Sequence, residues 1–479
     1  MKDHSGKASV TFYGGAGTVT GANFLLDAGD PANGRGAGVK ILFDCGALER
    51  EHVCDTSNGM PFAYDLRSID TLIVTHAHAD HIGRIPKLVH DGFKGTIYST
   101  AATKDLAELM FEDAIKVMEM DVERHGCEMI YQKEDVVAAL TLWRTQDYHD
   151  PFEVGSATIE FFDAGHILGA AMVKVTHAME GQTFHGRSDL PSSRSILFTG
   201  DLGNSPEPLL NDTEAPAGVN YVVMESVYGD RLHEGRDDRT DILRRAIEDT
   251  RMRNGVLLIP SFSIERTQIL LYEIEKMIED GAMEPIRVYL DAPLAIKITE
   301  VFRRHKDLLN AQVRARFEAG NDPFTFGGLK LTADASESHE IHNAPNPKVI
   351  IAGAGMSAGG RIRSHEKQYL PDEKATVLFV GYQAPGSLGR QIADGNKHVT
   401  IDGEKIRVRA QIATLTGYSG HRDRDGLMEF VEQLGDSLER VFVVMGEPKS
   451  EMFLSQRIRD FLGVEAIAPE QGQKIEIDW

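Results

Sequence analysis

The chain has few cysteines, no long apolar run and no excess of positive charge. Its three cysteines, Cys45, Cys54 and Cys127, show no close pairing along the 479 residues. We therefore expect no disulfide bond and a reducing, cytoplasmic location. No segment approaches the ~18 uninterrupted apolar residues of a membrane span. Residues 1–9 lack the apolar stretch of a secretory signal, so no membrane association is expected.

The formal net charge of −22 excludes a protein that holds nucleic acid through bulk positive charge. Any nuclease activity therefore requires a local positive site, such as a bound metal. The hydrophobic fraction of 42% is that of an ordinary globular protein. A chain of this length is expected to form two domains, one of them inserted in the other.

Short apolar runs rich in Val and Ile alternate with amphipathic segments. The helix after residue 103 is expected to begin at Thr103 as its N-cap, with Leu106, Met110 and Ala114 at helical spacing. This alternation predicts an α/β fold. The predicted strands are Val39–Phe43, Leu72–Thr75, Ile196–Thr199, Tyr221–Met224, Val256–Pro260, Val349–Ala352, Val377–Val380 and Val441–Val444.

The strongest chemical signal follows the predicted strand Leu72–Thr75. His76 and His78 are two residues apart, so in extended backbone their side chains project to the same side. Asp80 and His81 follow at the point where the chain turns. Imidazole and carboxylate groups are the ligands that zinc prefers outside cysteine sites. The HxHxDH spacing therefore predicts a metal site.

More ligands must come from distant segments. His166 follows the apolar run Ile159–Phe162, and Asp201 follows Ile196–Phe198, each beside glycine at a predicted strand end. We expect His166 to be a third histidine ligand and Asp201 a bridging carboxylate. Asp44 also ends a strand, and we expect it to orient a ligand histidine through its distal ring nitrogen.

These segments, in this order, resemble the metallo-β-lactamase superfamily, and the later ones resemble its β-CASP nucleases. The resemblance implies an αββα metallo-β-lactamase sandwich built from residues 1–230 and 396–479, with an inserted α/β β-CASP domain at 231–395. It covers essentially the whole chain. The matching later segments are Met224–Arg231, Ile259–Gln268, Gly355–Arg361, Val380–Ala384 and Ser419–Asp423.

The resemblance implies two zinc sites, of which the second is incomplete. The segment Val443–Pro448 carries Met445 where the family has a histidine, and a thioether is a poor zinc ligand among oxygen and nitrogen donors. We expect one tight zinc and a second site that is weak, partly occupied or filled by a different metal. The implied ligands are His76, His78, His166 and Asp201 for the first metal, and Asp80, His81 and Asp201 for the second.

The resemblance also implies a mechanism, in which zinc-bound hydroxide attacks the phosphorus of RNA. Asp80 would orient the nucleophile. His421, braced by Glu225, would protonate the leaving oxygen and leave a 5′-phosphate on the product. We expect Arg266, Arg361 and Ser419 to contact substrate phosphates, although a structural ion pair explains the two arginines equally well.

The predicted function is a zinc-dependent ribonuclease that cuts single-stranded RNA, internally and also from the 5′ end. The alternatives are a metallo-β-lactamase-fold hydrolase of DNA or of a small ester, lactone or β-lactam, and a non-catalytic binding subunit. The segment Gly353–Ala358 also fits the GxGxxA pattern of a dinucleotide-binding turn. The oligomeric state is open, with a homodimer as one expected assembly.

Overall fold

The computed structural model describes residues 7–29, 38–48, 53–178, 193–233 and 238–479, which form two compact units. Unit 1 comprises Met1–Glu207, Asn211–Leu232 and His421–Trp479, and unit 2 comprises Pro208–Leu210 and His233–Gly420. Unit 2 thus continues beyond the boundary at 395 that the sequence suggested. The reason is that strand β19 pairs with β16 in the sheet of unit 2.

Unit 1 contains two seven-stranded sheets, with the orders β22-β1-β2-β3-β4-β5-β6 and β21-β20-β11-β10-β9-β8-β7. The first sheet consists of β22 (Lys474–Asp478), β1 (Lys7–Gly14), β2 (Asn23–Asp27), β3 (Lys40–Phe43), β4 (Thr71–Ile73), β5 (Thr96–Ser99) and β6 (Trp143–Thr145). The second consists of β21 (Glu465–Ile467), β20 (Arg440–Val444), β11 (Tyr221–Glu225), β10 (Ser193–Phe198), β9 (Ala171–Ala178), β8 (Ala157–Asp163) and β7 (Phe152–Val154).

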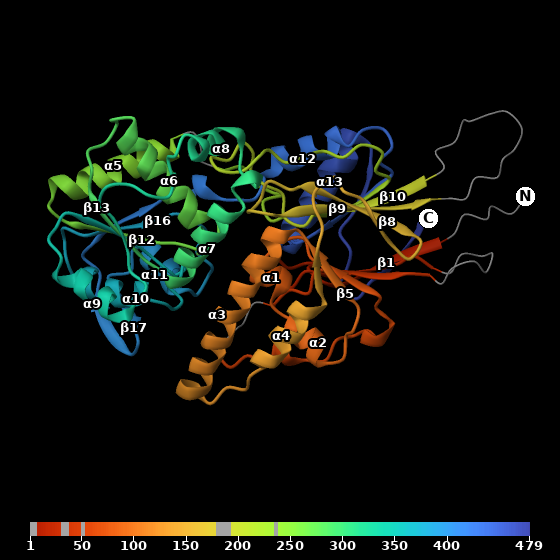
Figure 1. The fold of residues 1–479 in the computed structure, drawn as a ribbon, viewed down its shortest axis with the longest axis horizontal. Coiled ribbons are helices and arrows are strands. Elements are labelled where there is room, and N and C mark those ends of the chain that lie inside the picture. The colour runs from red at the N-terminus through yellow and green to blue at the C-terminus, as the bar shows by residue number, and fades with distance from the viewer. Residues whose placement is uncertain (1–6, 30–37, 49–52, 179–192, 234–237) are drawn as a thin grey trace, which may run out of the picture. The chain divides into compact units, whose positions relative to one another are not determined.

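The two sheets of unit 1 pack face to face through one apolar core. Phe43 and Phe198, one from each sheet, stack with their ring centroids 3.6 Å apart. Helices cover the outer faces of both sheets, which gives the αββα sandwich (Figure 1). They are α1 (Ala79–Ile82), α2 (Ile85–His90), α3 (Ala101–His125) and α4 (Lys133–Leu142) beside the first sheet, and α12 (Arg424–Gln433) and α13 (Pro448–Arg457) beside the second.

Unit 2 is built on a six-stranded parallel sheet of order β14-β13-β15-β12-β16-β19, with a separate hairpin of β17 and β18. Its strands are β12 (Val256–Pro260), β13 (Arg287–Asp291), β14 (Leu329–Leu331), β15 (Lys348–Ala352), β16 (Thr376–Phe379), β17 (His398–Ile401), β18 (Glu404–Arg407) and β19 (Gln411–Thr414). Its helices are α5 (Arg239–Met252), α6 (Arg266–Glu279), α7 (Pro293–Arg304), α8 (Ala311–Glu318), α9 (Ala335–Asn343), α10 (Ile362–Tyr369) and α11 (Leu388–Ala393). β12, β15 and β16 are buried along their whole length, which explains their continuous apolar sequences.

Short helical segments complete the chain: η1 (Ser57–Gly59), η2 (Leu66–Ser68), η3 (Lys306–Leu308), η4 (Thr416–Tyr418) and η5 (Ile458–Leu462). The eight strands predicted from apolar runs are all present within a few residues of their expected bounds. None of the helices in the described ranges is both long and apolar enough to cross a membrane.

The expected N-cap of the long helix α3 is wrong by three residues. Thr100, not Thr103, caps the helix, and its Oγ1 accepts a hydrogen bond of 3.2 Å from the backbone N–H of Thr103. The Thr103 hydroxyl instead donates to the carbonyl oxygen of Gly169. A threonine followed by a helical apolar stripe suits either position. The contact with Gly169 does not separate them, because the Thr100 hydroxyl donates to the same carbonyl oxygen at 2.7 Å.

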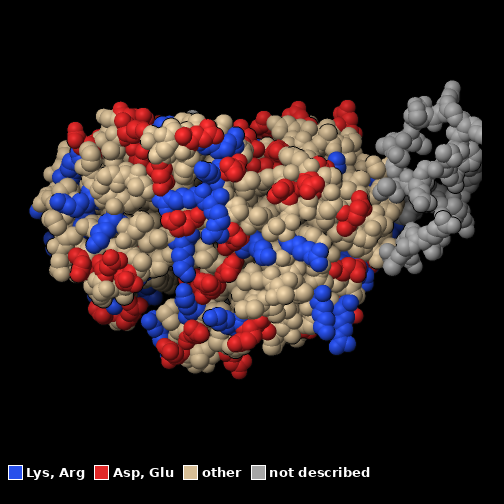
Figure 2. All heavy atoms as spheres, in the orientation of Figure 1, with Lys and Arg blue, Asp and Glu red and all other residues tan. Residues whose placement is uncertain are grey.

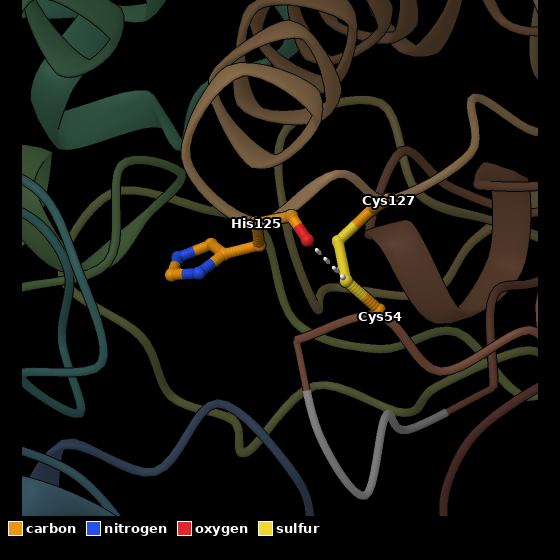
Figure 3. The surroundings of a disulfide bond; sticks show 3 residues. All are labelled: Cys54, His125 and Cys127. Carbon is orange, nitrogen blue, oxygen red and sulfur yellow. Dashed lines mark hydrogen bonds between the residues drawn. A yellow bond between two sulfur atoms is a disulfide. The ribbon is translucent and has the colours of Figure 1, made fainter.

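The expectation of no disulfide is also wrong, because Cys54 and Cys127 are bonded (Figure 3). The two residues are 73 positions apart, with Cα atoms at 5.1 Å. Helix α3 ends at His125, and Gly126 takes the left-handed conformation that turns the chain. That turn places Cys127 beside Cys54, whereas Cys45 is a buried free thiol. Sequence spacing did not reveal the pair because helix α3 brings its end back to an earlier segment.

Candidate metal centre

The loop that follows β4 carries His76 and His78, and His81 lies in the next helix, α1. Asp44 holds this segment in place. Asp44 accepts hydrogen bonds of 2.8 Å from both the backbone N–H and the hydroxyl of Thr75. Its Oδ2 also lies 2.7 Å from Nδ1 of His81. Asp44 and His81 are both buried. The contact at Nδ1 leaves the Nε2 atom of His81 directed at the other site residues.

The structure brings His76, His78, His166 and Asp201 together, although they come from three distant segments. One ligand atom from each of the four lies within 4.8 Å of the others. His78 Nδ1 is 3.1 Å from His76 Nε2 and 3.2 Å from His166 Nε2. Asp201 Oδ2 is 3.4 Å from His76 Nε2 and 3.5 Å from His166 Nε2. These donors therefore surround one point.

A second group consists of Asp80, His81 and Asp201, so Asp201 is common to both groups. Nε2 of His81 lies 3.3 Å from Oδ1 of Asp201 and 3.8 Å from Oδ2 of Asp80. In the described part of the chain, His81 Nε2 and Asp201 Oδ1 are buried without a hydrogen-bond partner. Buried polar atoms normally have partners, so this pair is suited to coordinate an ion between them.

The protonation states of His78, His166 and Asp201 suit a cation. Burial, together with the neighbouring His76, holds the pKa of His78 well below its usual value. Burial and His421 do the same for the pKa of His166. Burial raises the pKa of Asp201, but His81 and His76 outweigh it and leave that pKa well below its usual range. Neutral imidazoles and an ionised carboxylate are the forms that bind metal. The donor set fits zinc, with nitrogen and oxygen ligands in a buried pocket.

Met445 follows β20 and is not part of either donor group. Its side chain is buried in the core of unit 1. A Cβ added at Gly15 would lie 2.6 Å from its sulfur, and the Gly15 φ of +71° also favours glycine there. Met445 borders a cavity of about 10 Å³ together with His81 and Glu225. Met445 therefore lies near His81, while the described donors of the second group remain three.

His421, which is partly exposed, and the buried Glu225 form a pair beside these groups. Glu225 ends β11 and is fully buried, and its Oε1 accepts a hydrogen bond of 2.7 Å from the backbone N–H of Leu202. His421 Nδ1 lies 3.1 Å from the same oxygen and 3.9 Å from Oδ2 of Asp201. Burial lowers the pKa of His421, but Glu225 and Asp201 outweigh it and raise that pKa to about 9. The protonated form of His421 is therefore favoured.

The three expected phosphate contacts lie in unit 2. The guanidinium of Arg361 donates to Asp291 Oδ1 at 2.7 Å and to the carbonyl oxygens of Thr332 and Ala333, so the structural ion pair is present. Arg266 begins α6 and lies over the ring of Tyr418 at 5.6 Å. Ser419, next to Tyr418, is buried.

The GxGxxA segment does not form a dinucleotide-binding turn. β15 ends at Ala352 and α10 begins only at Ile362, whereas that motif requires a tight turn from strand to helix. Sequence reasoning also missed Thr75, whose two hydrogen bonds to Asp44 hold the histidine loop. Its position directly before His76 at a strand end was the available signal.

Three family models match the chain. They are the metallo-beta-lactamase superfamily domain at residues 35–184, the Beta-Casp domain at 267–392 and the Zn-dependent metallo-hydrolase RNA specificity domain at 405–469. The chain is 34% identical over 444 residues to "Ribonuclease TTHA0252" of Thermus thermophilus, covering 93% of this chain and 94% of that protein. It is 30% identical over 475 residues to "Transcription termination factor FttA" of Methanosarcina mazei, covering 96% of this chain and 70% of that protein.

The fold is also found among solved structures. One of them is a protein of unknown function from Enterococcus faecalis, which matches with a TM-score of 0.56 and 14% sequence identity over 98% of this chain and 100% of that chain. At this identity, the likeness concerns the fold alone.

Proposed function

Since the chain belongs to the β-CASP ribonuclease family of the metallo-β-lactamase superfamily, we propose that it is a zinc-dependent ribonuclease that cleaves single-stranded RNA. Membership makes it a hydrolytic nuclease that acts on RNA. The proposal adds the metal, the mechanism and the form of the substrate. The observation that carries it is the convergence of six metal-binding side chains beside the His421–Glu225 pair.

His76, His78, His166 and Asp201 would hold the tight zinc, and Asp80, His81 and Asp201 the weaker second metal. Zinc bound there would supply Lewis-acid activation of water and would offset the negative charge that develops on the phosphoryl group. Asp44 keeps His81 in the orientation that binding needs. Asp80 has a side chain that is 30% exposed, so it can accept a hydrogen bond from the attacking water and orient it.

His421 supplies the proton for the leaving oxygen in this proposal. Its Nδ1 faces Glu225, so Nε2 is the atom that carries the proton to the substrate. Protonation of the departing sugar oxygen at the 3′ position leaves the phosphate on the 5′ end of the other product. The charge of Glu225 keeps the imidazolium form available, which makes Glu225 a positioning residue.

We further propose that cutting starts within the strand and also proceeds from the 5′ end, that the protein acts in the cytoplasm, and that it assembles as a homodimer. Arg266 and Ser419 stay proposed contacts to substrate phosphates. Arg361 is proposed to contact a substrate phosphate as well, while its guanidinium keeps the hydrogen bond to Asp291. Cytosolic thiols are usually reduced, so the Cys54–Cys127 bond is unusual for a cytoplasmic protein.

The test compares labelled single-stranded RNA, single-stranded DNA and a chromogenic β-lactam as substrates of the purified chain. We expect cleavage of RNA, its loss after zinc is removed by a chelator, and its recovery when zinc is added back. Hydrolysis of the β-lactam or DNA in preference to RNA would favour the alternative hydrolases. Full RNA cleavage by zinc-free protein would refute the proposed mechanism.

A further inference from the structure

Two exposed aromatic side chains lie at one edge of the sheet of unit 2. Phe262 follows β12 and is 42% exposed, and Tyr382 follows β16 and is 51% exposed. The other exposed aromatic residues of the described ranges, Phe453 and Phe461, both lie beside the guanidinium of Arg457. In those same ranges, neither Phe262 nor Tyr382 stacks on another aromatic ring.

The topology of unit 2 places these two residues where open α/β sheets bind ligands. β15, β12 and β16 are parallel neighbours, so the loops at their carboxyl ends share one edge of the sheet. The connection from β12 runs along the sheet toward β13, whereas the connection from β15 runs in the opposite direction, past β12 to β16. Such a reversal of direction is the point at which doubly wound sheets form a ligand crevice.

Two glycines lie beside the ring of Phe262, and one of them, Gly355, makes room for it. A Cβ added at Gly355 would lie 2.7 Å from its Cδ2 and 2.8 Å from its Cε2. A Cβ added at Gly381, the residue before Tyr382, would lie 3.7 Å from its Cε2. The Phe262 ring therefore rests against the backbone of both neighbouring loops, and it lies close to the segment that carries Tyr382.

Buried polar contacts hold these loops in place. The side-chain amide of Gln383 donates to the carbonyl oxygens of Gly355 at 3.0 Å and Gly381 at 3.2 Å, so it ties the two glycine loops together. The carbonyl oxygen of Phe262 accepts a hydrogen bond of 2.7 Å from the hydroxyl of Thr267. The loops that carry the aromatic pair are therefore held in place, so binding does not need to order their backbone.

We propose that Phe262 and Tyr382 form a stacking platform for the bases of single-stranded RNA. This proposal rests on the proposed ribonuclease function. It adds a way to bind RNA to a chain whose net charge of −22 disfavours binding through phosphate contacts alone. Figure 2 shows acidic side chains beside basic ones on the face that it draws. Stacking needs no positive charge, and it accepts every base because every base has a π-face.

The test measures binding of a short fluorescein-labelled oligoadenylate to the full chain, in a His421→Ala background that spares the RNA. We expect Phe262→Ala to raise the dissociation constant about 5- to 150-fold, which is the range for the loss of one stacked base. Phe262→Tyr and Tyr382→Phe should retain binding, whereas Phe262→Leu and Tyr382→Ala should not. Phe461→Ala, which removes an exposed aromatic ring of unit 1, is the matched control and should leave binding unchanged.

An oligonucleotide with abasic positions separates stacking from a change in folding. The parent protein should bind it weakly, and Phe262→Ala should cause no further loss, because the contact is already missing. The dependence of binding on salt concentration should stay the same in Phe262→Ala, since no phosphate contact is removed.

The outcomes also separate the platform from the function on which it rests. If wild-type protein cleaves RNA while Phe262→Ala binds oligoadenylate as tightly as its parent, the platform alone is overturned. An equal loss on the normal and the abasic oligonucleotide also overturns it. If the parent binds no RNA and wild-type protein cleaves none, the proposed function fails together with the platform.

Discussion

His421 Nδ1 lies 3.1 Å from Oε1 of Glu225, although 196 positions separate the two residues in the sequence. The carboxylate is fully buried, and its second hydrogen bond comes from the backbone of Leu202, so it cannot turn away. This contact fixes the imidazole ring and its proton-bearing atom next to the metal-binding groups.

Replacing either member of the pair should slow RNA cleavage without releasing the tight zinc. We expect His421→Ala and Glu225→Gln each to lower single-turnover rates by about 10²- to 10⁴-fold, the usual contribution of general acid catalysis. The double variant should be no slower than the worse single variant, because the two groups act as one unit. Glu451→Gln, which alters a buried carboxyl bonded to Gly17 instead, should cleave normally. Additive losses would contradict a coupled role.

Zinc analysis of the purified protein should give clearly fewer than two tightly bound ions per chain. The second group has three described donors, and the thioether of the nearby Met445 is a poor zinc ligand. Met445→His should raise the bound zinc toward two, and Met445→Leu, which keeps the apolar volume, should leave it unchanged. Two tight ions in the unaltered chain would rule out the role assigned to Met445.

The stability of unit 2 should fall as the pH rises from about 4.5 to 8. Burial raises the pKa of Glu366 to about 8, although Ser357 donates a hydrogen bond to its carboxyl group. Between these pH values the folded chain holds a proton that the unfolded chain releases, so each pH unit lowers the unfolding free energy, by at most about 1.4 kcal/mol.

The measurement is denaturant unfolding of the wild type and of Glu366→Gln across this pH range. It shows whether the unfolding free energy falls as the pH rises. The glutamine stays neutral at every pH, so its curve should be flatter than that of the wild type. Parallel curves for the two proteins would show that Glu366 titrates normally in the folded state.

Reduction of the Cys54–Cys127 bond should destabilise unit 1 without unfolding it at once. The bond closes a loop over a sequence separation of 73 residues, and such links contribute about 2 to 4 kcal/mol. A thiol reagent should find no reactive group in the oxidised native protein and two after mild reduction. Cys45 should not react with the reagent until the protein unfolds, because its thiol is buried and its pKa is raised to about 12.

The Cys54→Ser/Cys127→Ser variant is the matched control for that experiment. It should melt at the temperature of the reduced wild type and should not respond to reductant. Thiol reactivity of the untreated wild type at both positions would mean that the bond is absent from the purified protein.

Local sequence predicted those features that depend on neighbouring residues. The strands β12, β15 and β16 are buried parallel strands, and an unbroken apolar run is sufficient to indicate such a strand. The HxHxDH spacing indicated a metal site because two alternating histidines at the end of a strand place two imidazoles on one side of the backbone. The end of unit 2 at Gly420 could not be predicted, because it depends on the pairing of β19 with β16.

By itself, the sequence determined the fold class, the positions of most strands and the identity of the metal-binding residue types, since periodicity and spacing are local properties of the chain. Only the tertiary structure decided which distant groups meet. It joined Cys54 to Cys127, bonded Arg361 to Asp291, and set Phe262 against Gly355. Each of these contacts depends on how elements pack across dozens of residues, and packing is a property of the whole fold.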